Sequence, residues 1–383
     1  MKRTEVLQEV RRMRFEEAYY GWQEGRLSQQ EAAMLLGICD RSFRRYRDRY
    51  ETRGMDGLLD KRLSQASCRR APVDEVMALQ DKYKSEYRGW NVKHFHTWYR
   101  REGGNRSYTW VKNRLQEAGL VHRVKRKGAH RKRRERAAMP GMLLHQDGSR
   151  HEWVPGKLWD LIVTMDDATS EHYSMFFVEE ESTQSSFKGV EETILQKGLF
   201  CSLYTDRGSH YWHTPEAGGK VDTVNLTQFG RAMKQLGITM IAAYSPEARG
   251  RSERMFGTHQ GRLPNELAKL NITTIQAANQ YLKDTYMLRC NAEFARDPRH
   301  KAMAFVPYIG IELKDILCEH YERTVGNDNC VHFERQILQI PPDQYRFNYV
   351  KTKVRVHRYH DGTLGVFHGP RKLANYNCQG QLL

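Results

Sequence analysis

The sequence has no long apolar run and no closely spaced pair of cysteines. No stretch of the 383 residues approaches the ~18 apolar residues that cross a bilayer, so we expect no transmembrane helix and no membrane partner. The seven cysteines are scattered without a Cys-x-x-Cys pair, which argues against a disulfide framework and against a cysteine-based zinc site. No apolar stretch follows the opening Met-Lys-Arg-Thr-Glu-Val, so we expect no secretory signal and a cytoplasmic location.

Acidic residues are few relative to basic ones. Asp and Glu number 46 against 62 Lys and Arg, which gives a formal net charge of +16. This excess predicts a polyanionic partner; a membrane surface is the alternative, but it requires an amphipathic basic helix or a lipid anchor. The mean hydropathy of −0.77 and the hydrophobic content of 39% indicate several small domains rather than one large globule.

Residues 1–65 are predicted to form a helix-turn-helix DNA-binding domain. Ser28 can cap a helix, and Glu31 three residues later completes a capping box. Ala33 is small enough for two helices to cross closely, and Gly37 permits the tight turn between them. We therefore expect a short helix that ends at this glycine and a second helix soon after it.

The second helix of this domain is expected from about Asp40 to Tyr50. Phe43 and Tyr46 can pack on the domain core while arginines on the other face enter the major groove. An ordinary helical hairpin with a solvated charged face is the alternative. The arginines predicted to contact DNA are Arg41, Arg44, Arg45 and Arg47.

Residues 66–121 are expected to form a second helical domain. Helices are predicted at 73–87 and 92–101, and Ser107 can cap a third helix that ends at Gly119. The pattern resembles a second helix-turn-helix or a winged helix, with a plain three-helix bundle as the alternative. Two cations are expected to face outward and to contact DNA, Lys112 and Arg114.

Residues 122–141 are predicted to be a basic linker. Nine of the 16 residues from Val121 to Arg136 are Lys or Arg, and only one is acidic. Like charges at this density repel one another, so we expect a disordered segment that follows DNA phosphates; a solvated tether is the alternative. The cations assigned to DNA here are Lys125, Arg126, Lys127, Arg131, Lys132, Arg133 and Arg134.

Residues 142–300 change character and are predicted to form an α/β catalytic core. The expected order is β-β-β-α-β-α-β-α, which implies a mixed sheet flanked by helices. Strands are predicted at 142–146, 159–165, 172–178, 199–205 and 238–243. Helices are predicted at 182–195 and 225–236, and a long last helix starts with Pro246 at its first position.

Residues 301–383 are predicted to be a β-rich DNA-binding domain in the form of a small antiparallel β-barrel. Strands are expected at 331–340, 351–359 and 363–368, and Asp361-Gly362 marks a hairpin turn between the last two. Lysines and arginines in the second of these strands give the domain positive faces.

Three acidic residues stand out in the core. Asp147 and Asp206 each follow an apolar run, so each is expected at or near a strand end, whereas Glu253 lies in the charged last helix. The first and fourth strands can be neighbours, and the helix can lie across the same end of the sheet. Three carboxylates brought together cannot all stay ionised cheaply, and Mg²⁺ or Mn²⁺ removes that conflict. Two such ions roughly 3.5–4 Å apart support in-line phosphoryl transfer.

The sequence around these acids is similar to that of a known family. His-Gln-Asp-Gly-Ser, Tyr-Thr-Asp-Arg-Gly-Ser and Ser-Pro-Glu-Ala-Arg-Gly-Arg-Ser-Glu-Arg resemble phrases of DDE-type insertion-sequence transposases, which have a ribonuclease-H-like integrase core. The resemblance is greatest to the ISNCY-type group and most specific from residue 142 to 267.

The resemblance implies cleavage at transposon ends and transfer of the 3′-hydroxyl into target DNA. The transposon ends and the target are both expected to be double-stranded DNA. It implies two Mg²⁺ or Mn²⁺ ions, with Asp147 touching both ions and Asp206 and Glu253 each holding one. It also implies a homo-oligomer on DNA and a place in the bacterial nucleoid.

Each acid has rivals nearby. Asp160 interrupts an apolar strand and is expected to be a satisfied buried or edge acid, and Asp166 and Asp167 sit where a turn favours aspartate. Glu247 competes with Glu253, but it lies in a first helical turn, where acids are favoured for capping alone. The cations expected to hold phosphates around the acids are Arg207, Arg249, Arg251 and Arg254.

Two other functions remain open from the sequence. One is a helix-turn-helix regulator with a degenerate core, and the complete set of three acids argues against it. The other is a ribonuclease-H-like nuclease that cuts without joining. The two N-terminal DNA-reading domains and the basic C-terminal domain favour a recombinase that binds specific DNA ends.

Overall fold

The computed structural model describes residues 3–60, 71–123, 134–216, 219–244 and 246–383. The chain divides into two compact units, Met1–Lys82 and Tyr83–Leu383, and each is described by itself. Six of the linker cations predicted to contact DNA, at 125–127 and 131–133, lie outside the described residues. Among the helices of the described ranges, none combines the length and the apolar character needed to cross a membrane.

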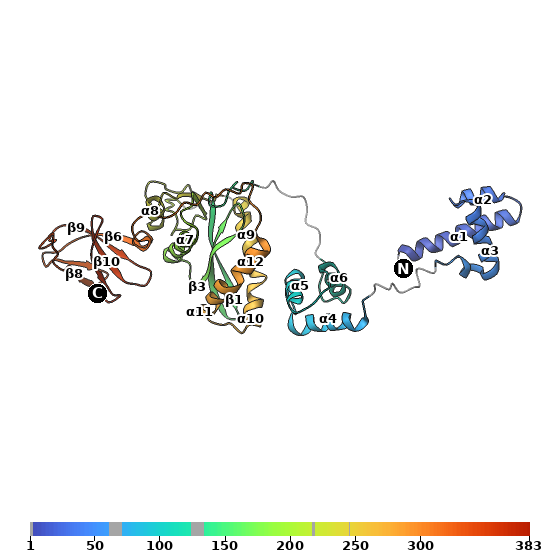
Figure 1. Cartoon of the computed structure of the whole chain (residues 1–383), viewed down its shortest axis with the longest axis horizontal. Coiled ribbons are helices and arrows are strands. Elements are labelled where there is room, and N and C mark those ends of the chain that lie inside the picture. Colours follow the sequence, from blue (N-terminus) through green and yellow to red (C-terminus); the bar gives the residue numbers. More distant parts are fainter. Residues whose placement is uncertain (1–2, 61–70, 124–133, 217–218, 245) are drawn as a thin grey trace. The chain divides into compact units, whose positions relative to one another are not determined.

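The first unit contains the predicted helix-turn-helix. Helices α1 (Arg3–Gln23), α2 (Gln29–Leu35) and α3 (Asp40–Arg53) are followed by a short 3₁₀ turn (Figure 1). The capping box forms as expected: the Glu31 amide donates to Ser28 Oγ at 3.2 Å, and the Ser28 amide donates to Glu31 Oε2 at 2.7 Å. Ala33 is buried where α2 packs, and Gly37 takes a φ of 66° in the turn.

A three-helix segment follows, and its limits are close to the predicted ones. It consists of α4 (Val73–Glu86), α5 (Val92–Arg101) and α6 (Tyr108–Glu117), and α4 runs across the division between the two units. Ser107 caps α6 as expected, because its Oγ accepts from the Trp110 amide at 3.3 Å.

The core is a mixed five-stranded sheet. Its strands are β1 (Leu144–Val154), β2 (Lys157–Asp166), β3 (His172–Val178), β4 (Ser202–Thr205) and β5 (Thr239–Ala242). The order across the sheet is β3-β2-β1-β4-β5, so the first and fourth strands are neighbours as predicted. The β1-β2-β3 meander is antiparallel, whereas β4 runs parallel to both β1 and β5.

Helices cover both faces of this sheet (Figure 1). On one face, α7 (Thr183–Lys197) and α8 (Gln228–Gln235) contribute Phe187 and Phe229 to a core with Leu144 and Leu203. On the other face, helices from α9 to α12 bury Leu161 and Val163. These helices are α9 (Pro246–Gln260), α10 (Leu263–Lys269), α11 (Ile275–Tyr281) and α12 (Met287–Phe294), with a π-turn (Leu282–Tyr286) between the last two. The sequence patterns had not separated α10, α11 and α12.

One predicted strand limit is wrong in a way that affects the site. The strand expected to end at residue 146 continues to Val154, so Asp147 lies inside β1 rather than at its end. The reason is the hairpin with β2, in which Asp147 lies opposite Val163. The antiparallel partner keeps β1 extended beyond the point where its parallel partner β4 stops.

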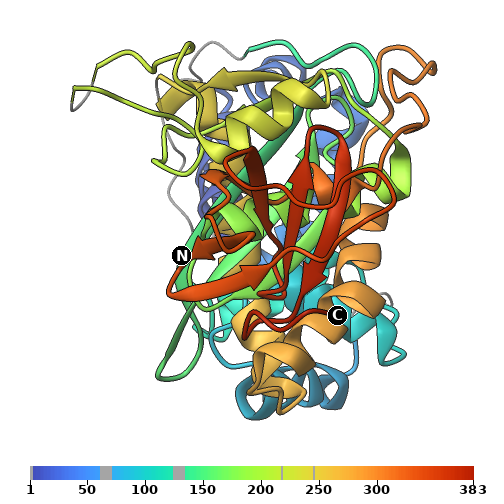
Figure 2. The same ribbon diagram turned by 90° about the vertical axis from the view of Figure 1, so that its left-hand side faces the viewer.

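The C-terminal residues form two separate sheets instead of the predicted barrel. Four strands, β6 (Glu319–Thr324), β9 (Lys353–Arg358), β10 (Leu364–His368) and β11 (Arg371–Tyr376), are ordered β11-β10-β9-β6. Figure 2 shows this C-terminal part, in red, toward the viewer. The hairpin of β7 (Cys330–Phe333) and β8 (Gln336–Gln339) forms a second sheet that shares one hydrophobic core with the four strands, and no closed barrel exists in the described residues. A single strand was expected over 331–340, but Glu334 and Arg335 take φ values of 47° and 67° and turn the chain there.

Candidate active site

The strand register brings Asp147 and Asp206 together. In the parallel pair of β1 and β4, Leu144 is the partner of Leu203, and His145 is the partner of Tyr204. The same register carried two residues further sets Asp147 beside Asp206, and neighbouring strands lie about 4.8 Å apart. Since β4 ends at Thr205, Asp206 follows the strand end, as the sequence predicted.

Both acids belong to the face of the sheet that α9 covers. Side chains alternate between faces along a strand, so Asp147 shares a face with His145, and Asp206 shares one with Tyr204. The rings of His145 and Tyr204 lie on one face, with centroids 5.2 Å apart. Ser149, two residues after Asp147, accepts a hydrogen bond of 3.0 Å from Gln260 of α9.

Helix α9 carries Glu253 along this face. Its first half is tied to the sheet through an ion pair between Arg251 and Asp167, and its end is tied through Gln260 to Ser149. Glu253 and Gln260 are seven residues apart, which places them on the same side of the helix. Glu253 thus lies between two anchors on the side of α9 that meets β1, and its side chain is exposed.

The three acids do not form a closed cage. In the described ranges, they are not among the groups of three ligating side chains whose ligand atoms lie within 4.8 Å of one another. Their donor set is all carboxylate oxygen, the type that hard divalent ions prefer.

Asp167 lies in the expected turn and is also a buried anchor. It is 0% exposed and lies 2.7 Å from the Nε2 atom of His145, 2.7 Å from the Ala137 amide and 2.6 Å from Arg134. Burial alone would raise its pKa, but these hydrogen bonds and the charge of Arg251 hold the pKa of Asp167 well below its usual value. His145 is accordingly a packed strand histidine bonded to this carboxylate.

The other rivals have structural partners. Asp166 accepts from the Gly141 amide at 2.9 Å and from the Thr169 amide at 2.8 Å, so it closes the expected turn. Asp160 is buried, and its Oδ2 accepts from the Glu181 amide at 2.7 Å. The side chain of Glu247 lies outside the described residues.

A fourth acid, Glu181, approaches the site and was not found from the sequence. Its carboxylate packs against Gly148, the residue after Asp147, where a Cβ would lie 2.3 Å from Glu181 Oε2. The Tyr211 hydroxyl lies 3.5 Å from Glu181 Oε1. Burial raises the pKa of Tyr211 well above its usual value, and the charges of Glu181, Asp147 and Asp206 raise it further. No local motif marks Glu181; only the start of α7 beside β1 brings it there.

The predicted phosphate-binding cations of the core already have protein partners. Arg251 and Arg134 are bound to Asp167, and Arg251 also donates to the Arg134 carbonyl at 2.7 Å. Arg207 donates to the Gly219 carbonyl at 3.0 Å, while exposed Arg254 donates to the Gly250 carbonyl in its own helix. The side chain of Arg249 lies outside the described residues.

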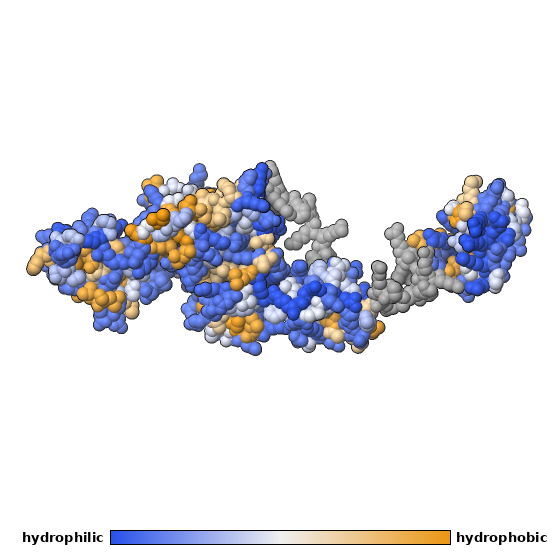
Figure 3. Space-filling model, in the orientation of Figure 1, coloured by the Kyte–Doolittle hydropathy of each residue, from blue (hydrophilic) through white to orange (hydrophobic). Residues whose placement is uncertain are grey.

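The arginines of α3 differ from one another in exposure. Arg41, Arg44 and Arg45 are exposed, opposite buried Phe43. Arg47 instead pairs with Asp48 at 2.9 Å and lies over the ring of Trp22, 5.1 Å from its centroid. The visible surface of this unit is largely hydrophilic (Figure 3).

The two outward cations predicted for the three-helix segment are only partly free. Lys112 lies 5.9 Å from the ring centroid of Tyr108, and Arg114 pairs with Glu117 at 2.8 Å on the same helix.

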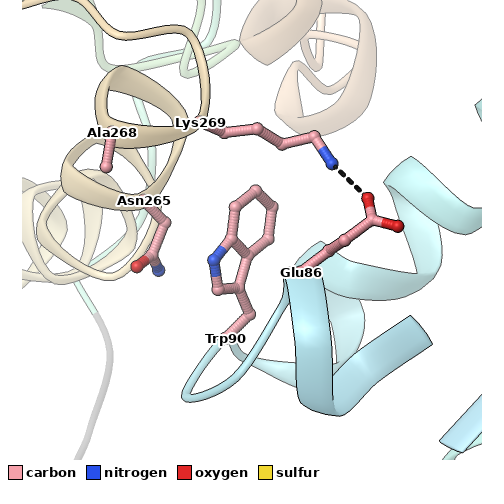
Figure 4. Close-up of a pocket in the computed structure, with 5 residues that line it drawn as sticks. All are labelled: Glu86, Trp90, Asn265, Ala268 and Lys269. Carbon is pink, nitrogen blue, oxygen red and sulfur yellow. Dashed lines mark hydrogen bonds and ion pairs between the residues drawn. The ribbon is translucent and has the colours of Figure 1, made fainter. Parts of the chain in front are cut away.

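The three-helix segment rests on α10, away from the acids. Glu86 and Lys269 pair at 3.2 Å beside Trp90 and Asn265, in a hollow also lined by Ala268 (Figure 4). None of these residues belongs to the acid cluster.

Buried charge strengthens the same contact. His94 of α5 lies 2.7 Å from Glu266 of α10, and both are buried. Burial alone would raise the pKa of Glu266, but hydrogen bonds from His94 and Tyr281 and the charge of Arg289 lower it to about 2. The contact therefore holds an ionised carboxylate inside the protein.

Comparison with known proteins gives a family model that matches the N-terminal part and two proteins that match most of the chain. Residues 21–70 match the family model described as winged helix-turn helix. The chain is 30% identical over 356 residues to the putative transposase y4bF of Sinorhizobium fredii (strain NBRC 101917 / NGR234), which covers 90% of this chain and 76% of that protein. It is 29% identical over 233 residues to the transposase for insertion sequence IS1202 of Streptococcus pneumoniae, covering 60% of this chain and 50% of that protein.

Solved structures give weaker matches. A simian T-cell lymphotropic virus intasome in complex with PP2A regulatory subunit B56 gamma aligns with 68% of this chain and 85% of that chain, at 14% identity and a TM-score of 0.35. The HTLV-2 integrase catalytic core domain in complex with magnesium aligns with 38% of this chain and 84% of that chain, at 15% identity and a TM-score of 0.30. TM-scores of this size carry no inference for this chain.

Proposed function

Because this chain belongs to the DDE-type insertion-sequence transposases, we propose that Asp147, Asp206 and Glu253 are its catalytic carboxylates. They would support cleavage at the transposon ends and joining of the freed 3′-hydroxyl to target DNA. The observation that carries the proposal is the β1–β4 register, which sets Asp147 beside Asp206 on the face that α9 covers.

The three carboxylates fit two Mg²⁺ or Mn²⁺ ions, because all their ligand atoms are hard oxygens. Asp147 would contact both ions, and Asp206 and Glu253 would each hold one. When bound, the ions would polarise the scissile phosphate and lower the pKa of the attacking hydroxyl or water.

The chain's own residues give this site its shape. Asp206 Oδ1 accepts a 2.8 Å hydrogen bond from the Gly208 amide, which orients its carboxylate. Asp167 holds Arg251 and thereby fixes the part of α9 that carries Glu253. An anchored α9 would reduce the ordering that the third carboxylate needs when metal and DNA bind.

Double-stranded DNA would contact several parts of the chain. We assign end recognition to the domain at 1–65 through the exposed arginines of α3, supported by the helical domain at 66–121. The linker at 122–141 would follow phosphates, the catalytic core would span 142–300, and the β-rich domain at 301–383 would add non-specific contacts. Joining two transposon ends to one target implies a homo-oligomer assembled on DNA in the nucleoid.

An end-joining assay tests the catalytic assignment. A labelled DNA carrying the element's end is incubated with Mg²⁺ and wild-type protein, Asp206→Asn, or Asp297→Asn. Asp297 is an exposed aspartate outside the site and serves as the matched control. Asp206→Asn should lower cleavage and joining by at least about 100-fold, since losing even an outer-shell partner of a metal costs about 10–100-fold.

End binding separates catalysis from folding in the same assay. Asp206→Asn should bind the labelled end as tightly as wild type does, and chelation of Mg²⁺ should stop the reaction without releasing DNA. Equal joining by Asp206→Asn and wild type would overturn the assignment. Cleavage without joining by the wild type would point to a nuclease instead.

A further inference from the structure

Three metal-ligating side chains outside the acid cluster meet in the four-stranded C-terminal sheet. Cys318 precedes β6, His320 lies on β6, and His357 lies on β9. His320 and His357 are direct partners in the antiparallel pairing of these strands. One ligand atom from each of the three residues lies within 4.8 Å of the others.

The cluster is buried and has unused ligand atoms. Cys318 is 0% exposed and His357 is 3% exposed. Within the described part of the chain, neither ring nitrogen of His357 has a hydrogen-bond partner. An unpaired buried polar atom is costly, so a buried imidazole without partners calls for a ligand.

His320 has the second interaction that bound histidines usually have. Its Nε2 lies 3.0 Å from the Asp315 carbonyl oxygen, and donation there leaves Nδ1 with a free lone pair. Metal-bound histidines commonly donate their other N–H to a backbone carbonyl in this way. The same carbonyl lies 3.5 Å from the sulfur of Cys318, so one backbone group orients two members of the cluster.

The side chains are of the types that zinc prefers. A neutral imidazole nitrogen and a thiolate sulfur are common zinc ligands, and the Cys318 thiol would release its proton when the metal binds.

Charged groups of both signs lie around the cluster. Lys372 pairs with buried Asp315 at 3.2 Å. Arg231 is held by the carbonyls of Ile316 and Cys318, to which its guanidinium donates at 3.1 Å and 2.5 Å. A thiolate at Cys318 would supply negative charge to a bound ion, and its soft sulfur favours zinc over hard cations.

We propose that Cys318, His320 and His357 bind a zinc ion that ties β6 to β9. Three protein ligands leave one position of a tetrahedral ion for water. The two rings are stacked, with centroids 3.7 Å apart and an angle of 11°, and Phe367 stacks on the far side of His357. In this arrangement the lone pairs of the two rings do not point to one place. Binding therefore requires the half-buried ring of His320 to tilt until both rings direct a nitrogen lone pair at the same ion.

Metal titration of the full-length protein tests this proposal. Protein stripped with a chelator is titrated with Zn²⁺ against a chromophoric competitor, and separately with Co²⁺, followed by absorption. Wild type should bind one Zn²⁺ per chain, and Co²⁺ should give d–d bands of a tetrahedral site with a thiolate charge-transfer band. Cys318→Ser should lose that band, and His357→Gln should bind Zn²⁺ at least tenfold more weakly. Cys378→Ser removes an exposed cysteine and should change neither signal.

Two results would overturn the zinc site. One is stoichiometric Zn²⁺ binding that Cys318→Ser retains at wild-type affinity, and the other is a wild type that binds no Zn²⁺. If Cys318→Ser loses its circular dichroism, His320→Asn at the half-buried position carries the same comparison. Mg²⁺-dependent end joining is measured on each variant separately, so failure of the zinc site and failure of the acid cluster give different results.

Discussion

Asp167 and Arg251 form an ion pair in which the carboxylate is completely buried and the guanidinium comes from the helix that carries Glu253. The same carboxylate also forms a hydrogen bond with His145 of β1 and an ion pair with Arg134 at the end of the linker. One buried charge thus joins a strand, a helix and the segment that leads into the core. The geometry of the acid cluster depends on this pair, although neither residue is one of the proposed metal ligands.

Asp167→Asn should therefore damage both stability and catalysis. Loss of the charge leaves Arg251 and Arg134 without their counterion, and breaking a buried pair costs about 3–5 kcal/mol. We expect the urea midpoint to fall accordingly and end joining to fall further than end binding. Arg251→Lys keeps the charge and should show a smaller loss. A midpoint unchanged in Asp167→Asn would contradict the anchoring role.

Glu181→Gln should weaken catalysis without abolishing it. Glu181 packs against Gly148, the residue after Asp147, and lies 3.5 Å from the Tyr211 hydroxyl, so its charge acts close to Asp147. We expect about a tenfold loss of joining and a higher Mg²⁺ requirement, in the range for groups that tune a metal site. Glu180→Gln is the matched control, since Glu180 is exposed. Equal Mg²⁺ curves for the two variants would remove Glu181 from the site.

Arg44→Ala and Arg45→Ala should weaken end binding more than Arg47→Ala does. The first two arginines are exposed on α3, whereas Arg47 is held by Asp48 and Trp22. Each of the first two should cost about 1–3 kcal/mol if it reads a base, or lower the salt slope of binding by about 1 if it contacts a phosphate. Fluorescence anisotropy at several salt concentrations separates these outcomes. The prediction fails if Arg47→Ala has the largest effect on DNA affinity at unchanged thermal stability.

The stability of the core should fall on mild acidification. Burial lowers the pKa of His172 to about 4, and burial with the charge of His172 lowers the pKa of His259 well below its usual value. Unfolding frees both rings to take protons near pH 6.5, so the unfolded state binds more protons below that pH. Stability is fully present above pH ~6.5 and is lost as the pH falls toward 4. A pKa difference of this size corresponds to roughly 3 kcal/mol for His172.

Thermal melts between pH 7.5 and 4.5 measure the slope of stability against pH. His172→Gln should flatten it, because one depressed histidine has been removed, but His94, His320 and His357 also have lowered pKa values and will keep part of it. His332→Gln, at an exposed position, should leave the slope as in wild type. An unaltered slope in His172→Gln would contradict the assignment to this ring.

Local patterns were enough to predict most of the core order and the first helices. The Ser28 capping box, the turn at Gly37 and the limits of α5 follow from residues within one helical turn of each other. The neighbouring positions of the first and fourth strands also followed, because both lead into a proposed ligand. The capping box, the turn and the helix limits depend on short-range chemistry that the sequence displays directly.

Features set by tertiary contacts could not be predicted in the same way. The length of β1 depends on its hairpin with β2, and the approach of Glu181 depends on how α7 starts beside β1. Asp167 lies in the predicted turn, but its partners come from the linker, β1 and α9 and could not be read from the local sequence. The strand expected over 331–340 is divided at Glu334 and Arg335, where the positive φ values turn the chain.

The pairing of Leu144 with Leu203 and of His145 with Tyr204 has a consequence for how such chains can vary in length. The relation between Asp147 and Asp206 depends on a register that is counted from the start of β1 and of β4, and not on the number of residues between the two acids. Insertions in the connection after β3, or at the tip of the β1–β2 hairpin, leave that count intact. Removal of a single residue between Leu144 and Asp147 would turn the aspartate to the opposite face of the sheet. We therefore expect this chain to accept insertions in the connections between the two acids, but no insertion or deletion within the three residues before the first.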